Sequence, residues 1–452
     1  MTKTNVRRRV AILGTGGRDY HNFNEFYRGN QDFEVVAFVA GAEEVYGKSL
    51  YEKVYPPELS GPLYPKGIPM YPGNKLSNLI KELKVDQVDL CLSDLASDQL
   101  MRWASIILSS GADFNLMSSL RTMIKSKKPV VSVCAVRTGA GKSTTTRRVA
   151  SILMKHKKKV VAVRHPMAYG ELGEQICQRY GKLEDVDKYN CTIEEREEYE
   201  PLLRKGILLY AGVDYRVILK EAEKEADVII WDGGNNDPPF FKPDINIVVA
   251  DALRIGHLGV FTYPGEVNAR MADVIVINKA DLAKREDVEK EKGNLRLVNP
   301  DAIIIEAKSE VTVDKPELIR GKRVVVVEDG PTVTHGGAPF AAGFVAAQKY
   351  GAAKIVDPRK SAVGSIKKAF EDFGHMKALI PAMGYWKEQL KDLEETINAV
   401  DCDSVVFGTP CDLSRFLSIN KPIAKVNYEL VEMGSPNLED VIVSVLGKLH
   451  AI

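Results

Sequence analysis

One stretch of the sequence, residues 129–148, limits the fold more than any other: PVVSVCAVRTGAGKSTTTRR. The apolar run Val130 to Ala135 suits a short buried strand, and the residues from Lys142 onward can form a helix. Between them, glycines let backbone N–H groups turn toward a phosphate, the lysine can reach the β- and γ-phosphate oxygens, and a serine hydroxyl can ligate Mg²⁺. This order predicts a phosphate-binding loop.

The loop departs from the usual pattern G-x-x-x-x-G-K-[ST], because Val136 stands where the first glycine is expected. Arg137 followed by T-G-A-G-K-S-T resembles instead the deviant loops of partition and nitrogenase-iron-protein ATPases, which carry a basic residue there. A chance match in a plain strand–helix turn is the alternative, and the motifs downstream argue against it. We therefore predict that the nucleotide contacts Thr138, Gly139, Ala140, Gly141, Lys142, Ser143 and Thr144.

Length and charge limit the class of protein. A chain of 452 residues is too long for one hydrophobic core and indicates about two to four domains. The formal net charge of +1 gives no electrostatic reason to expect nucleic acid or an anionic membrane as a partner, and no apolar run approaches the ~18 residues that span a bilayer. The cysteines form no C-x-x-C pair, so we expect reduced thiols in a cytoplasmic protein.

Alternating strands and glycine turns indicate an α/β protein of three units. We predict a Rossmann-like domain at residues 1–125, a central P-loop nucleotide-binding domain with a deviant Walker-A loop at residues 126–320, and a C-terminal α/β substrate domain at residues 321–452. The turn Gly14 to Gly17 is a partial G-x-G-x-x-G, with Asp19 in place of the last glycine. A ligand phosphate at this turn and a tight turn that packs a helix on the sheet are both open.

A Walker-B carboxylate follows the phosphate-binding loop. The apolar strand Asp227 to Trp231 ends in Asp232, the place where a carboxylate meets Mg²⁺ opposite the loop serine. We therefore predict that Ser143 and Asp232 hold Mg²⁺. Asp237, in the same loop, is either a second acid of the site or a turn former before two prolines.

Two other segments of the central unit bear on the site. The strand Val160 to Arg164 delivers its last residue and His165 to the ligand-binding edge of the sheet, where the histidine is either structural or functional. Residues 171–225 are rich in Glu and Lys and predict mainly helix. We interpret the charge run Glu194 to Glu200 as a solvated face.

The sequence Asn278-Lys279-Ala280-Asp281 has the N-K-x-D form of a guanine-binding motif and follows a predicted strand, Val274 to Ile277. Lys308, after the strand Ile303 to Glu306, resembles the last base-binding loop of G proteins. We predict that Asn278, Lys279, Asp281 and Lys308 surround the base. The choice between ATP and GTP stays open, because related ATPases use a similar asparagine.

A glycine-rich turn also follows the first strand of the C-terminal unit, Val324 to Val327. It reads Glu-Asp-Gly-Pro-Thr-Val-Thr-His-Gly-Gly over residues 328–337, and a helix is expected near Ala341. Backbone N–H groups at a helix start favour anions, so the turn is interpreted either as an anion site or as an ordinary glycine-rich connection.

With V-R-T-G-A-G-K-S, W-D-G-G-N-N-D, N-K-A-D and E-D-G-P-T-V-T-H-G-G in one chain, the protein resembles the cyclic 2,3-diphosphoglycerate synthetase family, including its uncharacterised members labelled as predicted GTPases. The resemblance implies ATP-dependent closure of an intramolecular phosphoanhydride, with Mg²⁺. It assigns Lys142, Ser143 and Asp232 to nucleotide and metal. It assigns an acidic substrate to Arg164, His165 and the 328–337 loop, and the predicted substrate-binding set is Arg164, His165, Asn235, Asn236, Glu328, Thr332, Thr334, His335 and Gly336.

Two functional hypotheses follow. In the first, the protein is a phosphoryl-transfer enzyme or ligase that passes a γ-phosphoryl group to a small phosphorylated or carboxylated acceptor. Its catalytic residues would be Arg137, Lys142, Arg164, His165 and His335, because two polyanions must be brought together by cations. In the second, it is a regulatory or metal-delivery GTPase that acts through a protein partner. A homodimer is compatible with both.

Overall fold

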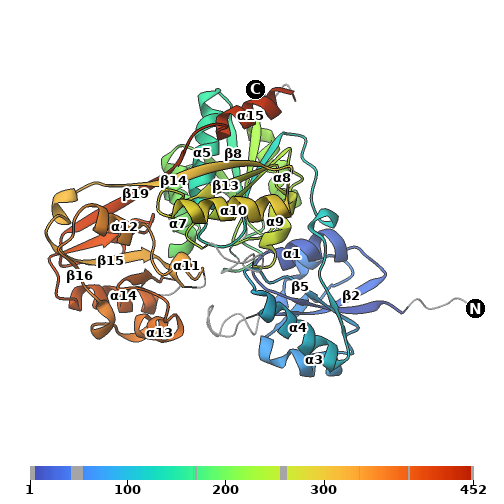
Figure 1. Ribbon diagram of the computed structural model, residues 1–452. Coiled ribbons are helices and arrows are strands. Elements are labelled where there is room, and N and C mark those ends of the chain that lie inside the picture. The colour runs from blue at the N-terminus through green and yellow to red at the C-terminus, as the bar shows by residue number, and fades with distance from the viewer. Residues whose placement is uncertain are drawn as a thin grey trace, which may run out of the picture.

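The computed structural model describes residues 6–41, 54–165, 167, 170–254, 262–334, 336–384 and 387–448. Figure 1 shows an N-terminal body and a C-terminal body on either side of a central one. Each is built of strands and helices, which confirms the predicted α/β class.

The N-terminal body is a six-stranded sheet in the order β3-β4-β2-β1-β5-β6, parallel except for the β3–β4 pair. Successive side chains of its central strand point to opposite faces, so Val10 and Ile12 join one core while Ala11 and Leu13 join the other. Its strands are β1 (Arg8–Leu13), β2 (Phe33–Val39), β3 (Val54–Tyr55), β4 (Ile68–Tyr71), β5 (Gln87–Leu90) and β6 (Asp113–Asn115). Its helices are α1 (Arg18–Asn22), α2 (Pro57–Ser60), α3 (Leu76–Glu82) and α4 (Ser97–Ser110).

The central body places the phosphate-loop strand in the middle of its sheet. The order is β14-β13-β12-β7-β11-β8-β10-β9, and apolar clusters cover both faces. Its strands are β7 (Val130–Ala135), β8 (Val160–Arg164), β9 (Gln178–Tyr180), β10 (Leu208–Ala211), β11 (Val228–Asp232), β12 (Ile245–Asp251), β13 (Val274–Asn278) and β14 (Ile303–Val313). Its helices are α5 (Lys142–Lys155), α6 (Glu184–Lys188), α7 (Ile193–Arg204), α8 (Tyr215–Glu225), α9 (Gly265–Met271) and α10 (Arg285–Val298).

The C-terminal body continues the same sheet. Its strands follow the order β16-β15-β18-β19, with β17 paired to β15. They are β15 (Arg323–Asp329), β16 (Lys354–Ile355), β17 (Ile380–Ala382), β18 (Ser404–Phe407) and β19 (Ile423–Glu432). The helices are α11 (Gly330–Val333), α12 (Ala342–Lys349), α13 (Gly364–Asp372), α14 (Lys387–Ala399) and α15 (Leu438–Lys448).

One long strand joins the central and C-terminal bodies. β14 pairs with β13 through Ile303–Glu306 and with β19, antiparallel, through Ala307–Val313. After β19 the chain returns to the centre, where Leu438 and Ile442 of α15 join the core beside α5 (Figure 1). The division at residue 320, predicted from sequence, does not anticipate this return.

The segment 171–225 is mainly helical, as predicted, with α6, α7 and α8 and the two short strands β9 and β10. One local prediction is wrong. The run Glu194 to Glu200 is not a solvated face, since three of its carboxylates are buried. Glu200 is held by Arg196, Arg204 and Arg415, and Glu197 accepts a hydrogen bond from the Thr409 hydroxyl. Partners on the same helix and from the C-terminal body therefore offset the cost of burying these carboxylates.

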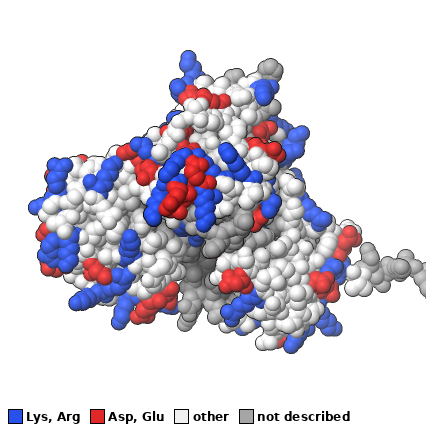
Figure 2. All heavy atoms as spheres, viewed as in Figure 1, with Lys and Arg blue, Asp and Glu red and all other residues white. Residues whose placement is uncertain are grey.

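The surface carries charges of both signs. Figure 2 shows them gathered most densely over α10, where Arg285 and Lys292 form ion pairs with Glu289 and Glu306. Within the described residues, none of the helices combines the length and the apolar character that a membrane crossing requires.

Candidate active site

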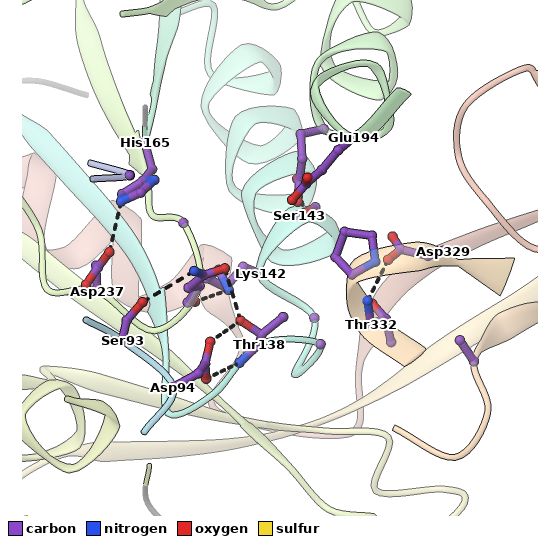
Figure 3. Close-up of a pocket in the computed structure, with 18 of the residues that line it drawn as sticks. Ser93, Asp94, Thr138, Lys142, Ser143, His165, Glu194, Asp237, Asp329 and Thr332 are labelled. Atoms are coloured by element: carbon purple, nitrogen blue, oxygen red, sulfur yellow. Dashed lines mark hydrogen bonds and ion pairs between the residues drawn. The ribbon is translucent and has the colours of Figure 1, made fainter. Parts of the chain in front are cut away.

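A cavity of about 930 Å³ opens where the three bodies meet. The phosphate-binding loop lies at its centre, between the strand ends of the N-terminal sheet and the start of α11 (Figure 3). The acidic and basic residues of its wall among those described are Arg18, Asp19, Asp94, Arg102, Lys142, Arg164, His165, Glu194, Glu198, Asp237, Lys279 and Asp329.

The loop has the backbone that phosphate binding requires. Gly139 and Gly141 have φ of 77° and 116°, the left-handed region that favours glycine. A Cβ on Gly141 would lie 2.1 Å from the Asn278 side-chain nitrogen, so no larger residue fits there. Lys142 is buried and its Nζ donates to the Asn235 carbonyl oxygen. Burial lowers the pKa of Lys142, and the nearby Arg164 charge lowers it further.

A carboxylate from the N-terminal body touches this loop. Asp94 accepts hydrogen bonds from the Thr138 N–H, at 3.0 Å, and from the Thr138 hydroxyl. Its φ is 54°, rare for a residue with a side chain. Its own N–H donates to Asn236 at 2.9 Å. No sequence pattern points to Asp94, because its partners lie in another unit.

The two predicted magnesium residues, Ser143 and Asp232, are connected through Glu198 and Arg164. Asp232 is 1% exposed and accepts from the Thr146 hydroxyl at 2.8 Å. Arg164 lies 3.0 Å from Asp232 and 2.9 Å from Glu198. Ser143 donates to Glu198 at 2.7 Å. Burial lowers the pKa of Arg164, but the carboxylates of Asp232 and Glu198 outweigh it and raise that pKa above its ordinary value.

These oxygen donors fit Mg²⁺, which prefers hard oxygen ligands. Ser143 contributes a hydroxyl from the loop that holds the phosphates, and Asp232 a carboxylate from the adjacent strand end. The cation that lies between the carboxylates here is the Arg164 guanidinium.

His165 and Asp237 form a second pair on the wall (Figure 3). Nε2 of the imidazole lies 2.9 Å from the carboxylate, and Arg18 of the N-terminal body approaches the same carboxylate at 3.5 Å. Burial raises the pKa of Asp237, but Arg18 and His165 outweigh it and hold that pKa below its ordinary value. Asp237 is therefore an ionised carboxylate that links the central body to Arg18 of the N-terminal body, so it does more than form the turn.

The two asparagines before Asp237 take different places. Asn235 lines the cavity. Asn236 is fully buried and donates to the Val136 and Thr262 carbonyl oxygens, so it holds the loop from behind. Arg137 is half-buried beside Arg254 and is not part of the cavity wall.

The N-K-A-D motif is split in position. Asn278 donates to the Ala140 carbonyl oxygen at 2.9 Å, and Lys279 donates to Gly139 at 2.8 Å while pairing with Asp251 at 2.9 Å. Both brace the phosphate loop and line the cavity. Asp281 and Lys308 are exposed or nearly so and do not line it; Lys308 pairs with Glu310.

In the C-terminal turn the chain's own carboxylates accept from the backbone N–H groups. Buried Glu328 accepts from Ala341, Gly343 and Phe344 at the start of α12. Burial raises the pKa of Glu328 to about 7. Asp329 accepts from the Thr332 N–H at 2.9 Å, and these two residues reach the cavity.

The other substrate residues predicted in this turn are placed as follows. The Thr334 hydroxyl donates to the Gly330 carbonyl, and neither Thr334 nor Gly336 lines the cavity. Glu328 does not line it either. His335 lies outside the described residues.

The N-terminal glycine turn is filled by a carboxylate from its own chain. Asp19 accepts from the N–H groups of Gly16 and Gly17 at 3.0 Å and of Tyr20 at 2.7 Å. A side chain therefore occupies the place where a ligand phosphate would bind, which favours the interpretation as a structural turn.

Comparison with known proteins adds a family to this geometry. No family model matches the chain. It is 55% identical over 437 residues to arginine synthetase ArcE of Thermococcus kodakarensis, covering 96% of each protein. It is 26% identical over 336 residues to cyclic 2,3-diphosphoglycerate synthetase of Thermococcus sibiricus, covering 66% of this chain and 72% of that protein.

The chain belongs to the cyclic 2,3-diphosphoglycerate synthetase family. This confirms the resemblance carried by the four motifs. Among solved structures, LpxK of Aquifex aeolicus in complex with ATP is similar with a TM-score of 0.42 and 13% identity, covering 82% of this chain and 99% of that one. The hydrogenase maturation factor HypB of Archaeoglobus fulgidus is similar with a TM-score of 0.28 and 21% identity, covering 40% and 81%. Membership indicates a nucleotide-using enzyme of the synthetase type.

Proposed function

We propose that this member of the family is a nucleoside-triphosphate-dependent ligase that forms the guanidinium group of arginine. The similarity to arginine synthetase over nearly the full length of both proteins supports this product. Arginine differs from the ureido amino acid citrulline by one nitrogen in place of one oxygen, so a synthetase for it has to activate that oxygen and bring in ammonia.

The charge of the side chains in the cavity wall carries the proposal. Beside Ser143 the wall is acidic: Glu194 and Glu198 from α7 face Asp329 from the C-terminal body. Burial raises the pKa of Asp329 to about 6, and the nearby Glu198 charge adds to the rise. Such a wall favours a neutral or cationic ureido or guanidinium end and repels a polyanion such as diphosphoglycerate.

Cations stand at the other end of the cavity. Arg18 and Arg102 of the N-terminal body line it, and the Arg18 side chain is buried. A guanidinium binds a carboxylate through paired N–H groups. We assign the α-carboxylate of the amino acid to this end, which orients its side chain toward the phosphate-binding loop.

The chemistry then has two steps. The ureido oxygen attacks the γ-phosphorus, an O–P bond forms, and the bond to the nucleoside diphosphate breaks. Ammonia next attacks the ureido carbon, the C–O bond breaks, and inorganic phosphate leaves with the oxygen while one proton of ammonia is lost.

Lys142 neutralises charge on the transferring group, as point charges do in most phosphoryl transfer. Mg²⁺, held by Ser143 and Asp232, would neutralise the phosphate oxygens when bound. His165, oriented by Asp237, is the proposed acceptor of the ammonia proton.

The test is a direct synthesis. Purified protein is incubated with Mg²⁺, ammonium and citrulline, with ATP or GTP, and arginine is measured by chromatography beside released phosphate. We expect arginine and phosphate in equal amounts, with the Lys142→Ala variant as the inactive control. Cyclisation of 2,3-diphosphoglycerate without arginine formation would overturn the assigned substrate. Slow hydrolysis unaffected by any acceptor would favour a regulatory GTPase instead.

A further inference from the structure

Glu198 lies beside the predicted magnesium site and contacts its residues. It projects from α7, and α7 packs against the helix that starts at Lys142. One carboxylate oxygen accepts from the Ser143 hydroxyl at 2.7 Å, and the other lies 2.9 Å from Arg164. The loop hydroxyl that would ligate Mg²⁺ is therefore hydrogen-bonded to Glu198.

The surroundings of Glu198 are those of a cation site. Arg164 is 3% exposed and bridges Glu198 to Asp232, with contacts of 2.9 and 3.0 Å. Two carboxylates, from α7 and β11, thus contact one guanidinium, and the Ser143 hydroxyl donates to one of them. Two carboxylates that contact the same guanidinium repel each other unless a cation lies between them.

We propose that Glu198 is a third protein ligand of the nucleotide-bound Mg²⁺, together with Ser143 and Asp232. Mg²⁺ is commonly bound by one or two carboxylates together with phosphate oxygens and water. Glu198 faces the cavity, whereas the neighbouring carboxylates Glu197 and Glu200 contact Thr409 and Arg204. The proposal rests on the nucleotide use in the proposed function but not on its acceptor.

Binding of Mn²⁺ and ADP tests the proposal without turnover. Free Mn²⁺ is measured by electron paramagnetic resonance with ADP-saturated protein, and ADP affinity is measured separately in EDTA. Glu198→Gln should weaken Mn²⁺ binding roughly 10- to 100-fold, the range for losing a supporting carboxylate at a metal site. The affinity for metal-free ADP should stay within about twofold, because the glycine loop holds the phosphates.

Two variants serve as controls. Glu184→Gln, at an exposed position of α6 away from the cavity wall, removes the same charge and should leave Mn²⁺ binding unchanged. Glu198→Asp keeps the carboxylate on a shorter stem and should retain part of the affinity, and it carries the test if Glu198→Gln fails to fold.

Unchanged Mn²⁺ binding in Glu198→Gln would overturn the proposal. So would an equal loss of ADP affinity with and without metal, which would make Glu198 a positioning residue for Ser143 and Arg164. Absence of arginine synthesis would overturn the proposed substrate and leave this result intact. Failure of the unaltered protein to bind Mn²⁺ with ADP would overturn the metal site itself.

Discussion

The chain makes the same local structure twice, a strand followed by a glycine turn and a helix, and uses it in two ways. After β1, the carboxylate of Asp19 accepts from the N–H groups of Gly16 and Gly17. Both turns line the cavity, but after β7 a carboxylate reaches only the edge of the loop, where Asp94 accepts from Thr138.

The difference shows that glycine spacing predicts backbone freedom but not whether a carboxylate of the chain itself accepts from the turn's N–H groups. In the first turn an aspartate a few residues on supplies the anion itself. The C-terminal turn behaves in the same way, because Glu328 accepts from Ala341, Gly343 and Phe344. A loop that binds a ligand phosphate must leave its N–H groups without a carboxylate of its own.

Among the variants that test this difference, Lys142→Ala should have the largest effect. It removes the buried ammonium group beside the phosphate-binding loop, and we expect nucleotide-dependent turnover to fall by roughly 10³-fold, the upper range for losing one positioned donor. Turnover is measured as arginine and phosphate release, with folding checked by circular dichroism.

The matched control is Lys155→Ala at the other end of the same helix, where the side chain pairs with Glu439 on the surface. It should retain turnover, because an exposed pair contributes little. Normal turnover in a folded Lys142→Ala protein would refute the nucleotide site.

Asp19→Ala tests the filled turn. Three backbone N–H groups would lose their acceptor, so we expect the free energy of unfolding to fall by about 3 kcal/mol while nucleotide affinity is retained. Urea unfolding measures the first and titration with ADP the second. Asp113→Ala, which removes an exposed aspartate of the same sheet, is the control and should cost little.

The same variant tests whether the first turn can bind an anion once Asp19 is removed. If Asp19 stands in for a phosphate, sulfate should raise the melting temperature of Asp19→Ala more than that of the unaltered protein. An equal response of both proteins to sulfate would show that the first turn differs from the phosphate loop in more than its carboxylate.

The fold was predictable where the signal is local. The strand Val130 to Ala135 and the strand Val160 to Arg164 have the bounds expected from apolar runs between turn residues. The phosphate loop and Asp232 were found because their chemistry is contained in a few adjacent positions. β9 and β10 were missed, since short strands in a Glu- and Lys-rich segment gain their apolar environment only from the sheet.

The missed site residues act across segments. Glu198 lies in a charge run that is normally solvated, and only the fold shows that Ser143 and Arg164 meet it. Asp94 lies 44 residues before its partner Thr138. Nothing in a single sequence distinguishes such carboxylates from surface ones.

The C-terminal turn gives a pH test of the comparison. Burial raises the pKa of Glu328 from an ordinary value of 4.5 to about 7. The folded chain therefore binds more protons than the unfolded chain between these values, and stability contributed by Glu328 falls as pH rises through that window. The advantage of the unaltered protein over Glu328→Gln should shrink by roughly 1–3 kcal/mol between pH 5 and pH 8.

Urea unfolding at the two pH values measures it. An advantage that grows with pH would mean that the ionised carboxylate is the stabilising form, as a bound phosphate would be. Glu371→Gln, on a surface-exposed helical position of the same body, is the control for general titration and should show no such trend.

The smallest effect is expected at the far end of the N-K-A-D motif. Asn278 and Lys279 donate hydrogen bonds to the phosphate-binding loop. Asp281, in contrast, is exposed and does not line the cavity. A guanine site needs the aspartate to accept from the base, and its replacement by asparagine would then favour xanthosine triphosphate. We expect adenine use, so Asp281→Asn should leave relative rates with ATP, GTP and xanthosine triphosphate within about twofold of those of the unaltered protein. Competition among the three nucleotides measures this.

Asn278→Ala is the contrasting variant, and it should weaken binding of all three nucleotides alike because it releases the Ala140 carbonyl. A gain of roughly tenfold or more for xanthosine triphosphate in Asp281→Asn would contradict the expectation, since a polar group that reads a base discriminates at least that strongly, and it would assign GTP to this loop.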